Sequence, residues 1–165
     1  MIGSVGSFKS CHPVLHLVAK CVLFWKEPGK GCYQFSTEDE LAKTLGEANC
    51  LYWGAVLMGM AYTFVNQMLM TGKVRKDVKK LVPHLQLVHV APVIPVDIDD
   101  SDSCANYLIK ERISGTFVKY INNNSAVPAH SLDSKEAEIR LFLCPMQHIQ
   151  YCLSNEMVYL SDFQG

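Results

Sequence analysis

The sequence lacks an excess of charge of either sign. Its 165 residues carry 15 Lys and Arg against 16 Asp and Glu, a net charge of −1. Without a basic excess, we expect no nucleic-acid partner for the chain as a whole. Charged residues are few, at 19%, and hydrophobic residues make up 49%, which excludes intrinsic disorder. The length predicts one domain, residues 1–165, with room for a sizeable core.

Paired cysteine motifs are also missing. The chain has seven cysteines, but no two of them stand at C-x-x-C spacing, which excludes a zinc knuckle and a thioredoxin-like motif. The first twenty residues lack the basic start and apolar run of a signal peptide. Free thiols and no leader together favour a reducing compartment, so we expect a cytoplasmic protein.

Both strands and helices are expected, and we predict an α+β fold. Thr37 and Glu40 fit a capping box at the start of a helix over 38–70, and Gly72 is placed to end it. A second helix is expected over 135–153, with an interruption or a kink at Pro145. Strands are expected over four ranges, with the middle two paired around Ser114 and Gly115. These ranges are 14–25, 107–113, 117–121 and 157–162.

The second half of the first predicted helix allows a different interpretation. Residues 51–70 contain no charged side chain, and this length would span a bilayer. A basic cluster follows over 73–80, as it does at cytoplasmic ends of membrane spans. Tyr52, Asn66 and Gln67 weaken that interpretation, and the alternative is a helix buried in a globular domain. We expect the buried helix.

Three groups of residues could carry chemistry. Gly3 and Gly6 begin a glycine-rich turn, and Lys20 stands on a strand that follows it; such a turn and lysine can bind phosphate groups. A second group is the run Gly-Thr-Phe-Val-Lys-Tyr-Ile-Asn-Asn-Asn at 115–124. A third is His148, followed by Asp-Phe-Gln-Gly at 162–165. A carboxylate and an amide so close together suit a magnesium ion.

In this order, the three groups resemble the alpha-kinase family of atypical protein kinases. The resemblance is strongest over 107–165, where the family has G-x-[FY]-x-K-Y followed by asparagines, then a helix with a histidine, then D-[LIF]-Q-G. His148 precedes Asp162 by fourteen residues, as the family pattern requires. The His-Arg-Asp and Ala-Pro-Glu motifs of ordinary protein kinases are absent from the sequence.

The resemblance implies a role for each matching residue. Gly3 and Gly6 would form the hairpin over the nucleotide, and Lys20 would contact the ATP phosphates. Asn123 would lie in the active-site pocket as a catalytic residue. Asp162 would be catalytic and would hold magnesium together with Gln164, while His148 would be one ligand of a structural zinc ion. The reaction would be transfer of the γ-phosphoryl group of ATP to Ser or Thr of a protein substrate.

The resemblance also implies a division into lobes. Residues 1–109 would form an N-lobe, with a twisted, mostly antiparallel sheet packed on the long helix. Residues 110–165 would form the hinge and the start of a truncated C-lobe. Apolar surface exposed at this break would favour association.

The chain departs from the family pattern in several places. Lys110 stands where the family usually has the adenine-binding glutamate, with Glu111 beside it. The family continues after D-x-Q-G into a T-D-P loop and supplies a further His and two Cys for the zinc ion. Cys144 and Cys152 do not stand at those positions. We therefore expect weak or no activity. Two alternatives stay open: a non-catalytic interaction module or gene-product fragment and, less favoured, a single-pass membrane protein.

Overall fold

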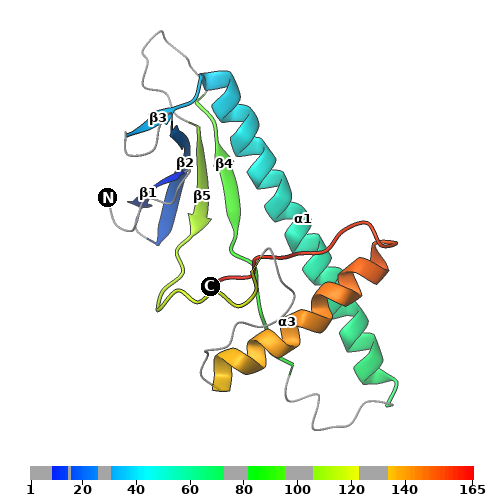
Figure 1. Ribbon diagram of the computed structural model, residues 1–165. Helices are drawn as coiled ribbons and strands as arrows, with labels where there is room; N and C mark the ends of the chain where they lie inside the picture. The colour runs from blue at the N-terminus through cyan, green and yellow to red at the C-terminus, as the bar shows by residue number, and fades with distance from the viewer. Residues whose placement is uncertain (1–8, 15, 26–30, 73–81, 96–105, 123–133) are drawn as a thin grey trace. The chain divides into compact units, whose positions relative to one another are not determined.

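The computed structural model describes residues 9–14, 16–25, 31–72, 82–95, 106–122 and 134–165 (Figure 1). The chain divides into two compact units. The first contains Met1–Tyr52 and Val88–Arg112, and the second contains Trp53–Leu87 and Ile113–Gly165. A single long helix, α1, contributes to both, and each unit is described by itself.

The first unit is built on an antiparallel sheet (Figure 1). Its strands run in the order β1-β2-β5-β4, and β3 pairs with the other end of β2. All four pairings are antiparallel, which confirms the predicted α+β fold with an antiparallel sheet. The strands are β1 (Lys9–Val14), β2 (Leu17–Trp25), β3 (Cys32–Gln34), β4 (Val90–Val93) and β5 (Tyr107–Glu111).

The range 14–25, predicted as one strand, contains the last residue of β1 and the whole of β2. β1 and β2 pair from Lys9 opposite Val22 to Val14 opposite Leu17. Val14 therefore closes β1, and β2 begins three residues later. The β-branched and aromatic composition identified the strand, but it carried no signal for the tight connection.

Helix α1 (Thr37–Met70) begins and ends where the sequence predicts, but its cap is different. Ser36 Oγ accepts a hydrogen bond from the Asp39 backbone N–H at 3.2 Å and donates one to the Asp39 carboxylate at 2.8 Å. Ser36 is thus the capping residue in place of Thr37, and its hydroxyl is oriented by the Asp39 carboxylate. At the other end, Gly72 has a φ of +72°, a conformation that glycine adopts without strain.

Glu40 does not cap α1. Its carboxylate joins the helix to the sheet instead. Its side chain is buried, and one carboxylate oxygen accepts a hydrogen bond from the backbone N–H of Asn106, directly before β5. The other oxygen accepts a hydrogen bond from Cys21 Sγ on β2 at 3.5 Å. Further along α1, the Tyr52 hydroxyl donates to the Val90 carbonyl of β4 at 3.2 Å. The helix therefore packs on the sheet through polar contacts to three strands or their ends.

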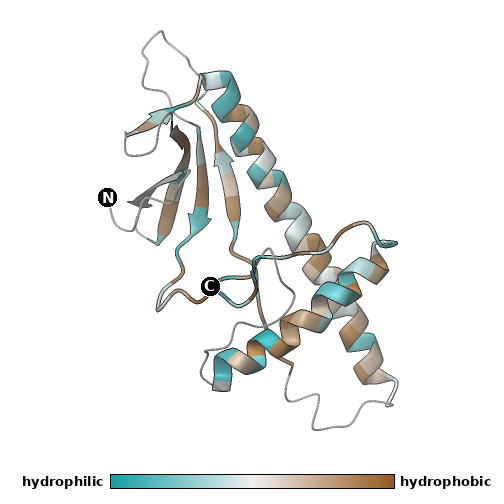
Figure 2. Ribbon diagram, in the orientation of Figure 1, coloured by the Kyte–Doolittle hydropathy of each residue, from teal (hydrophilic) through white to brown (hydrophobic). Residues whose placement is uncertain are grey.

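The second unit places helix α3 (Ser134–Leu153) across the C-terminal half of α1 (Figure 1). Its bounds confirm the second predicted helix, but Pro145 lies inside a continuous helix, so the predicted interruption there is wrong. Figure 2 shows hydrophobic residues along both helices in this region. The core of the unit is formed by buried side chains from α1, α3 and the two segments around 121 and 163. These are Met58, Ala61, Ile121, Leu143, Met146 and Phe163.

Two strand predictions are wrong. Residues 117–121 do not pair with 107–113 but with the end of the chain, through a single bridge between Lys119 and Gln164. Residues 157–162 form no strand. Instead, glutamine side chains of α3 make the hydrogen bonds to Leu160 that a neighbouring strand would make.

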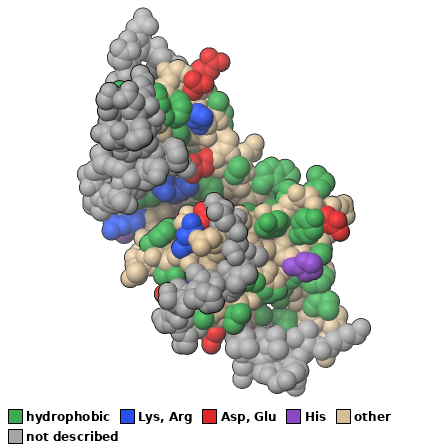
Figure 3. Space-filling model, viewed as in Figure 1, with side chains coloured by type: hydrophobic (Ala, Val, Ile, Leu, Met, Phe, Trp, Pro, Cys, Tyr) green, Lys and Arg blue, Asp and Glu red, His purple; other side chains and the backbone are tan. Residues whose placement is uncertain are grey.

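Helix α1 is long and apolar enough to cross a membrane by length and composition, and 28% of its most apolar window is buried. Leu57, Met58 and Ala61 are buried, whereas other hydrophobic side chains of α1 are exposed. Among these are Tyr52, Trp53, Val56 and Met60. Figure 3 shows hydrophobic side chains reaching the surface in several places on the viewed face.

Candidate functional site

The end of the chain is held against residues 118–121 by a short backbone ladder. Val118 and Gly165 exchange two hydrogen bonds, at 2.6 and 2.9 Å. The N–H groups of Tyr120 and Ile121 both donate to the Phe163 carbonyl, at 2.8 and 3.2 Å. This ladder brings the motif around Lys119 beside the Asp-Phe-Gln-Gly motif, two segments that are more than forty residues apart in the sequence.

Within the ladder, Lys119 and Asp162 form an ion pair. Lys119 Nζ lies 2.8 Å from Asp162 Oδ1, and both side chains are partly exposed. The two predicted magnesium ligands, Asp162 and Gln164, stand on either side of Phe163, which is buried in the core. The aromatic ring thus anchors a segment whose flanking oxygen-bearing side chains are accessible.

Asp162 has a left-handed backbone, with a φ of +58°. Few residues other than glycine adopt this conformation, and Asp and Asn are the most tolerant of them. Such strain persists where the surrounding structure enforces it, and it is frequent at functional sites. Here the ladder to residues 118–121 and the burial of Phe163 fix the backbone on one side of Asp162.

Two buried glutamines of α3 fix the backbone on the other side. Gln147 Nε2 donates to the Leu160 carbonyl at 2.7 Å, and Gln150 Oε1 accepts from the Leu160 N–H at 2.8 Å. Gln150 Nε2 also donates to Met58 Sδ of α1 at 3.3 Å. Leu160 is therefore held by both of its backbone polar groups, two residues before Asp162.

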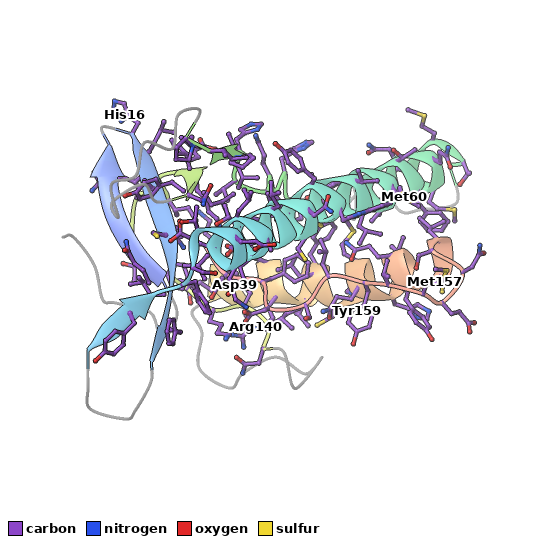
Figure 4. The ribbon with its side chains drawn as sticks, turned by 90° about the horizontal axis from the view of Figure 1, so that it is seen from above. His16, Asp39, Met60, Arg140, Met157 and Tyr159 are labelled. Carbon is purple, nitrogen blue, oxygen red and sulfur yellow. The ribbon has the colours of Figure 1, made fainter. Side chains whose placement is uncertain are left out.

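Arg140 holds the Lys119 segment in a similar way. Its side chain is 2% exposed, and Nη2 donates to the Lys119 carbonyl at 3.0 Å (Figure 4). The sequence alone gives no role for Arg140 or for Lys119, although Lys119 lies inside the recognised motif. A lone arginine on a helix carries no signal that its guanidinium will reach a backbone carbonyl far along the chain.

The first unit contains Lys20, Lys110 and Glu111. Lys20 stands opposite Leu108 and Lys110 opposite Val18 on the paired strands β2 and β5, so the two lysines occupy diagonal positions about 7–8 Å apart on one face. Lys110 Nζ forms an ion pair with Glu47 Oε1 of α1 at 2.8 Å. Glu111 is exposed at the end of β5, and its backbone N–H donates to the His89 carbonyl at 3.1 Å.

Cys21, next to Lys20 on β2, is buried against Glu40. Burial raises the pKa of the Cys21 thiol to about 12, with a further contribution from the Glu40 carboxylate. The thiol therefore stays protonated at neutral pH and donates its hydrogen bond to Glu40. Its neighbour Lys20, half-buried, points to the other face of β2.

His148, the predicted zinc ligand, is exposed on α3. Its Nε2 atom lies 3.7 Å from Cys152 Sγ, one helical turn later. Among the described residues, no group of three or more His, Cys, Asp or Glu side chains could hold a metal ion. The spacing of His148 and Cys152, four residues on a helix, was the signal that could have paired them from the sequence.

The remaining predicted site residues cannot be placed. Gly3, Gly6 and Asn123 lie outside the described residues. The other candidates fall into two sets, Lys20, Lys110 and Glu111 in the first unit and His148, Asp162 and Gln164 in the second.

The model of the alpha-kinase family matches residues 30–165. This range includes β3, α1, β4, β5, α3 and both motifs of the Lys119–Asp162 site. No curated protein and no solved structure matches the chain.

Proposed function

Because the chain belongs to the alpha-kinase family, we propose that it binds ATP with magnesium and phosphorylates Ser or Thr in a protein substrate. A kinase-type function follows from the family. The nucleotide, the ion and the acceptor residue are the finer parts of the proposal. The observation that carries them is the Lys119–Asp162 ion pair, with Gln164 two residues further along.

The donor set at this position suits a magnesium ion. Asp162 offers a carboxylate and Gln164 an amide oxygen, and hard oxygen ligands are those that Mg²⁺ prefers. Magnesium, when bound, would neutralise charge on the ATP phosphates. Lys119 would occupy the Asp162 carboxylate until the ion arrives, because its ammonium group pairs with Oδ1, and the ion would have to displace it.

In the reaction, the acceptor oxygen of Ser or Thr forms a bond to the γ-phosphorus of ATP. The bond from that phosphorus to the bridging oxygen breaks, ADP leaves, and the hydroxyl proton is released. Such transfers depend mainly on positioning and on neutralising charge. Lys20, on the face of the sheet that also carries Lys110, is the residue we propose for the phosphates, and Glu111 and the β5 backbone are proposed for adenine.

The ion pair between Lys110 and Glu47 favours a second candidate function. Lys110 stands at the usual adenine-binding position, and its side chain is already paired with Glu47 of α1. A chain that keeps this fold but does not bind nucleotide would act as an interaction module. Its partners would meet the exposed apolar side chains of the second unit, among them Met157 and Tyr159.

Nucleotide binding separates the two candidates. The full chain should bind a non-hydrolysable ATP analogue, and binding should require Mg²⁺. We expect Asp162→Asn to weaken this binding at least ~tenfold, about 1.4 kcal/mol, while the neighbouring Ser161→Ala leaves it unchanged. Asn tolerates the left-handed backbone of residue 162, so the variant tests the charge rather than the fold. Absence of magnesium-dependent binding in the unmodified chain would leave the interaction module as the function.

Transfer itself requires a separate assay. We expect a weak transfer of labelled phosphate from ATP to Ser or Thr of a protein substrate. This transfer should be lost in Asp162→Asn. We also propose a cytoplasmic location, where the free cysteines would stay reduced.

A further inference from the structure

The segment that follows α3 runs back along the helix (Figure 1) and is hydrogen-bonded along one side. Ser154 Oγ accepts a hydrogen bond from the Val158 N–H at 3.0 Å and donates one to the Val158 carbonyl at 2.8 Å. Gln147 and Gln150 bind the carbonyl and the N–H of Leu160. Side chains of α3 and of the residue after it therefore satisfy both backbone groups of two alternate residues, Val158 and Leu160.

The residues between and after them have free backbone groups. In the part of the chain that the structure describes, the N–H and C=O groups of Tyr159 and Ser161 form no hydrogen bond. Both residues are exposed. In an extended chain, the two backbone groups of one residue point to one side, and those of the next residue point to the opposite side. The groups of Tyr159 and Ser161 therefore face away from α3 and form an edge to which another strand can add.

The edge is short and uncharged. Positive φ angles of 54° and 64° at Asn155 and Glu156 precede it, and one of 58° at Asp162 follows it, so extended backbone is confined to residues 157–161. These five residues carry no charge, and the side chains of the first three are apolar and exposed. An acidic or basic partner finds no complementary charge here, whereas an identical edge meets no repulsion.

We propose that two copies of this chain associate through this edge, as antiparallel strands related by a two-fold axis. Such an axis brings the same patch of both copies together. With Leu160 opposite Leu160 of the other copy, Tyr159 lies opposite Ser161 of the other copy, and the reverse. Each of these pairs exchanges two hydrogen bonds, which uses every free backbone group of both residues in both copies. Leu160 forms the non-hydrogen-bonded pair between them, as its satisfied backbone requires.

The bonds already made within the chain select this register. A shift by two residues in one direction places Ser161 opposite Met157, whose N–H already donates to the Ser154 carbonyl at 3.3 Å. A shift in the other direction places Tyr159 opposite Phe163, whose carbonyl already accepts two hydrogen bonds. Both shifts leave free groups of the edge without partners. The pairing of Tyr159 with Ser161 is therefore the register that we expect.

Sedimentation velocity of the full chain over a range of concentrations tests the association. Reductant is present, because the exposed Cys50 and Cys152 could otherwise link two copies. We expect a monomer in dilute solution and a dimer as the concentration rises, since a two-stranded pairing of this length is weak by itself. Tyr159→Pro removes an N–H that the monomer does not use, and it should weaken dimerisation at least ~tenfold. Tyr159→Val keeps the N–H and suits an extended strand, so it should still dimerise.

Hydrogen exchange of the unmodified chain tests the same edge without a substitution. The Val158 and Leu160 amides should be protected at every concentration, because they are bonded within the chain. The Tyr159 and Ser161 amides should exchange rapidly in the monomer and become protected as the dimer forms.

Three results would overturn the proposal: a chain that stays monomeric, a dimer in which the Tyr159 and Ser161 amides still exchange rapidly, or a Tyr159→Pro variant that folds and associates as tightly as Tyr159→Val. Protection that develops only when a different polypeptide is added would exclude the second copy as the occupant. These measurements use no nucleotide, so their outcome is independent of kinase activity.

Discussion

Lys110 Nζ lies 2.8 Å from Glu47 Oε1, an ion pair between β5 and α1 across 63 residues of sequence. Both side chains are largely buried, at 13% and 20% exposed. Because removal of one partner leaves the other partly desolvated, we expect Lys110→Met to lower the free energy of unfolding by about 1–3 kcal/mol. Urea denaturation would measure it.

The double variant Lys110→Glu/Glu47→Lys is the control for that experiment. It restores opposite charges at the same two positions, so it should recover part of the lost stability. The unfolding free energies of Lys110→Glu, Glu47→Lys and the double variant would be compared. If the loss in the double variant equals the sum of the losses in the two single variants, the pair does not act as a unit.

Lys119 should compete with metal ions for Asp162. Its ammonium group pairs with Asp162 Oδ1 at 2.8 Å and repels an approaching cation. We expect Lys119→Met to bind Mg²⁺ more tightly than the unmodified chain when nucleotide is absent, measured by calorimetric titration. Lys135→Met, which removes an exposed lysine at the start of α3, should leave Mg²⁺ affinity unchanged. Equal affinities in all three proteins would contradict the prediction.

Gln150 should stabilise the second unit and the site together. It is fully buried and bonds both Leu160 and Met58. Gln150→Leu introduces an apolar side chain of similar size and leaves the Leu160 N–H without this acceptor, so we expect a loss of about 1–3 kcal/mol in unfolding free energy. Gln67→Leu, at an exposed position of α1, is the matched control and should cost little. Weaker magnesium-dependent binding should accompany the loss in Gln150→Leu alone.

The buried thiol of Cys21 should make stability fall in alkaline solution. Burial and Glu40 raise its pKa from 9.0 to about 12 in the folded chain, while the unfolded thiol keeps the ordinary value. The folded state therefore retains a proton that the unfolded state loses, and the stability that is complete below pH 9 decreases between pH 9 and 12. The slope is at most about 1.4 kcal/mol per pH unit. Denaturation midpoints of Cys21→Ala should decrease less steeply over this range, and those of Cys50→Ala should follow the unmodified chain.

The chain should remain in the supernatant when cells are lysed without detergent. Met58 and Ala61 of α1 are buried in the core of the second unit, and Gln150 of α3 bonds Met58. Lipid surrounding the helix would remove these contacts. Recovery only in the membrane fraction would show that α1 crosses the bilayer.

The sequence predicted the bounds of helices better than it predicted which residues the helices and strands contact. The bounds of α1 follow from local signals, a capping residue and Gly72, and local signals are present in the sequence. The cap itself was misassigned because Glu40 is drawn to Asn106 and Cys21, contacts that depend on the assembled sheet. Such tertiary contacts override the local capping preference, and the residues next to Glu40 in the sequence do not indicate them.

The two strand errors have the same origin. Residues 157–162 begin with a short apolar run, which a strand can also have, but Gln147 and Gln150 supply the hydrogen bonds of Leu160 from a helix. Residues 117–121 pair with 163–165 rather than with the nearest strand. The motifs of the candidate site were nevertheless identified, because their residue types and order are properties of the sequence. The role of Arg140 required coordinates, because its guanidinium bonds a carbonyl 21 residues away.

The left-handed backbone at Asp162 restricts what evolution can place there. Most side chains would strain this position, but Asn would not, and a single-base change in the codon converts Asp to Asn. A lineage could therefore lose the charge at this site in one step and keep a folded chain. This backbone therefore allows inactive relatives in which residue 162 is Asn and the chain still folds.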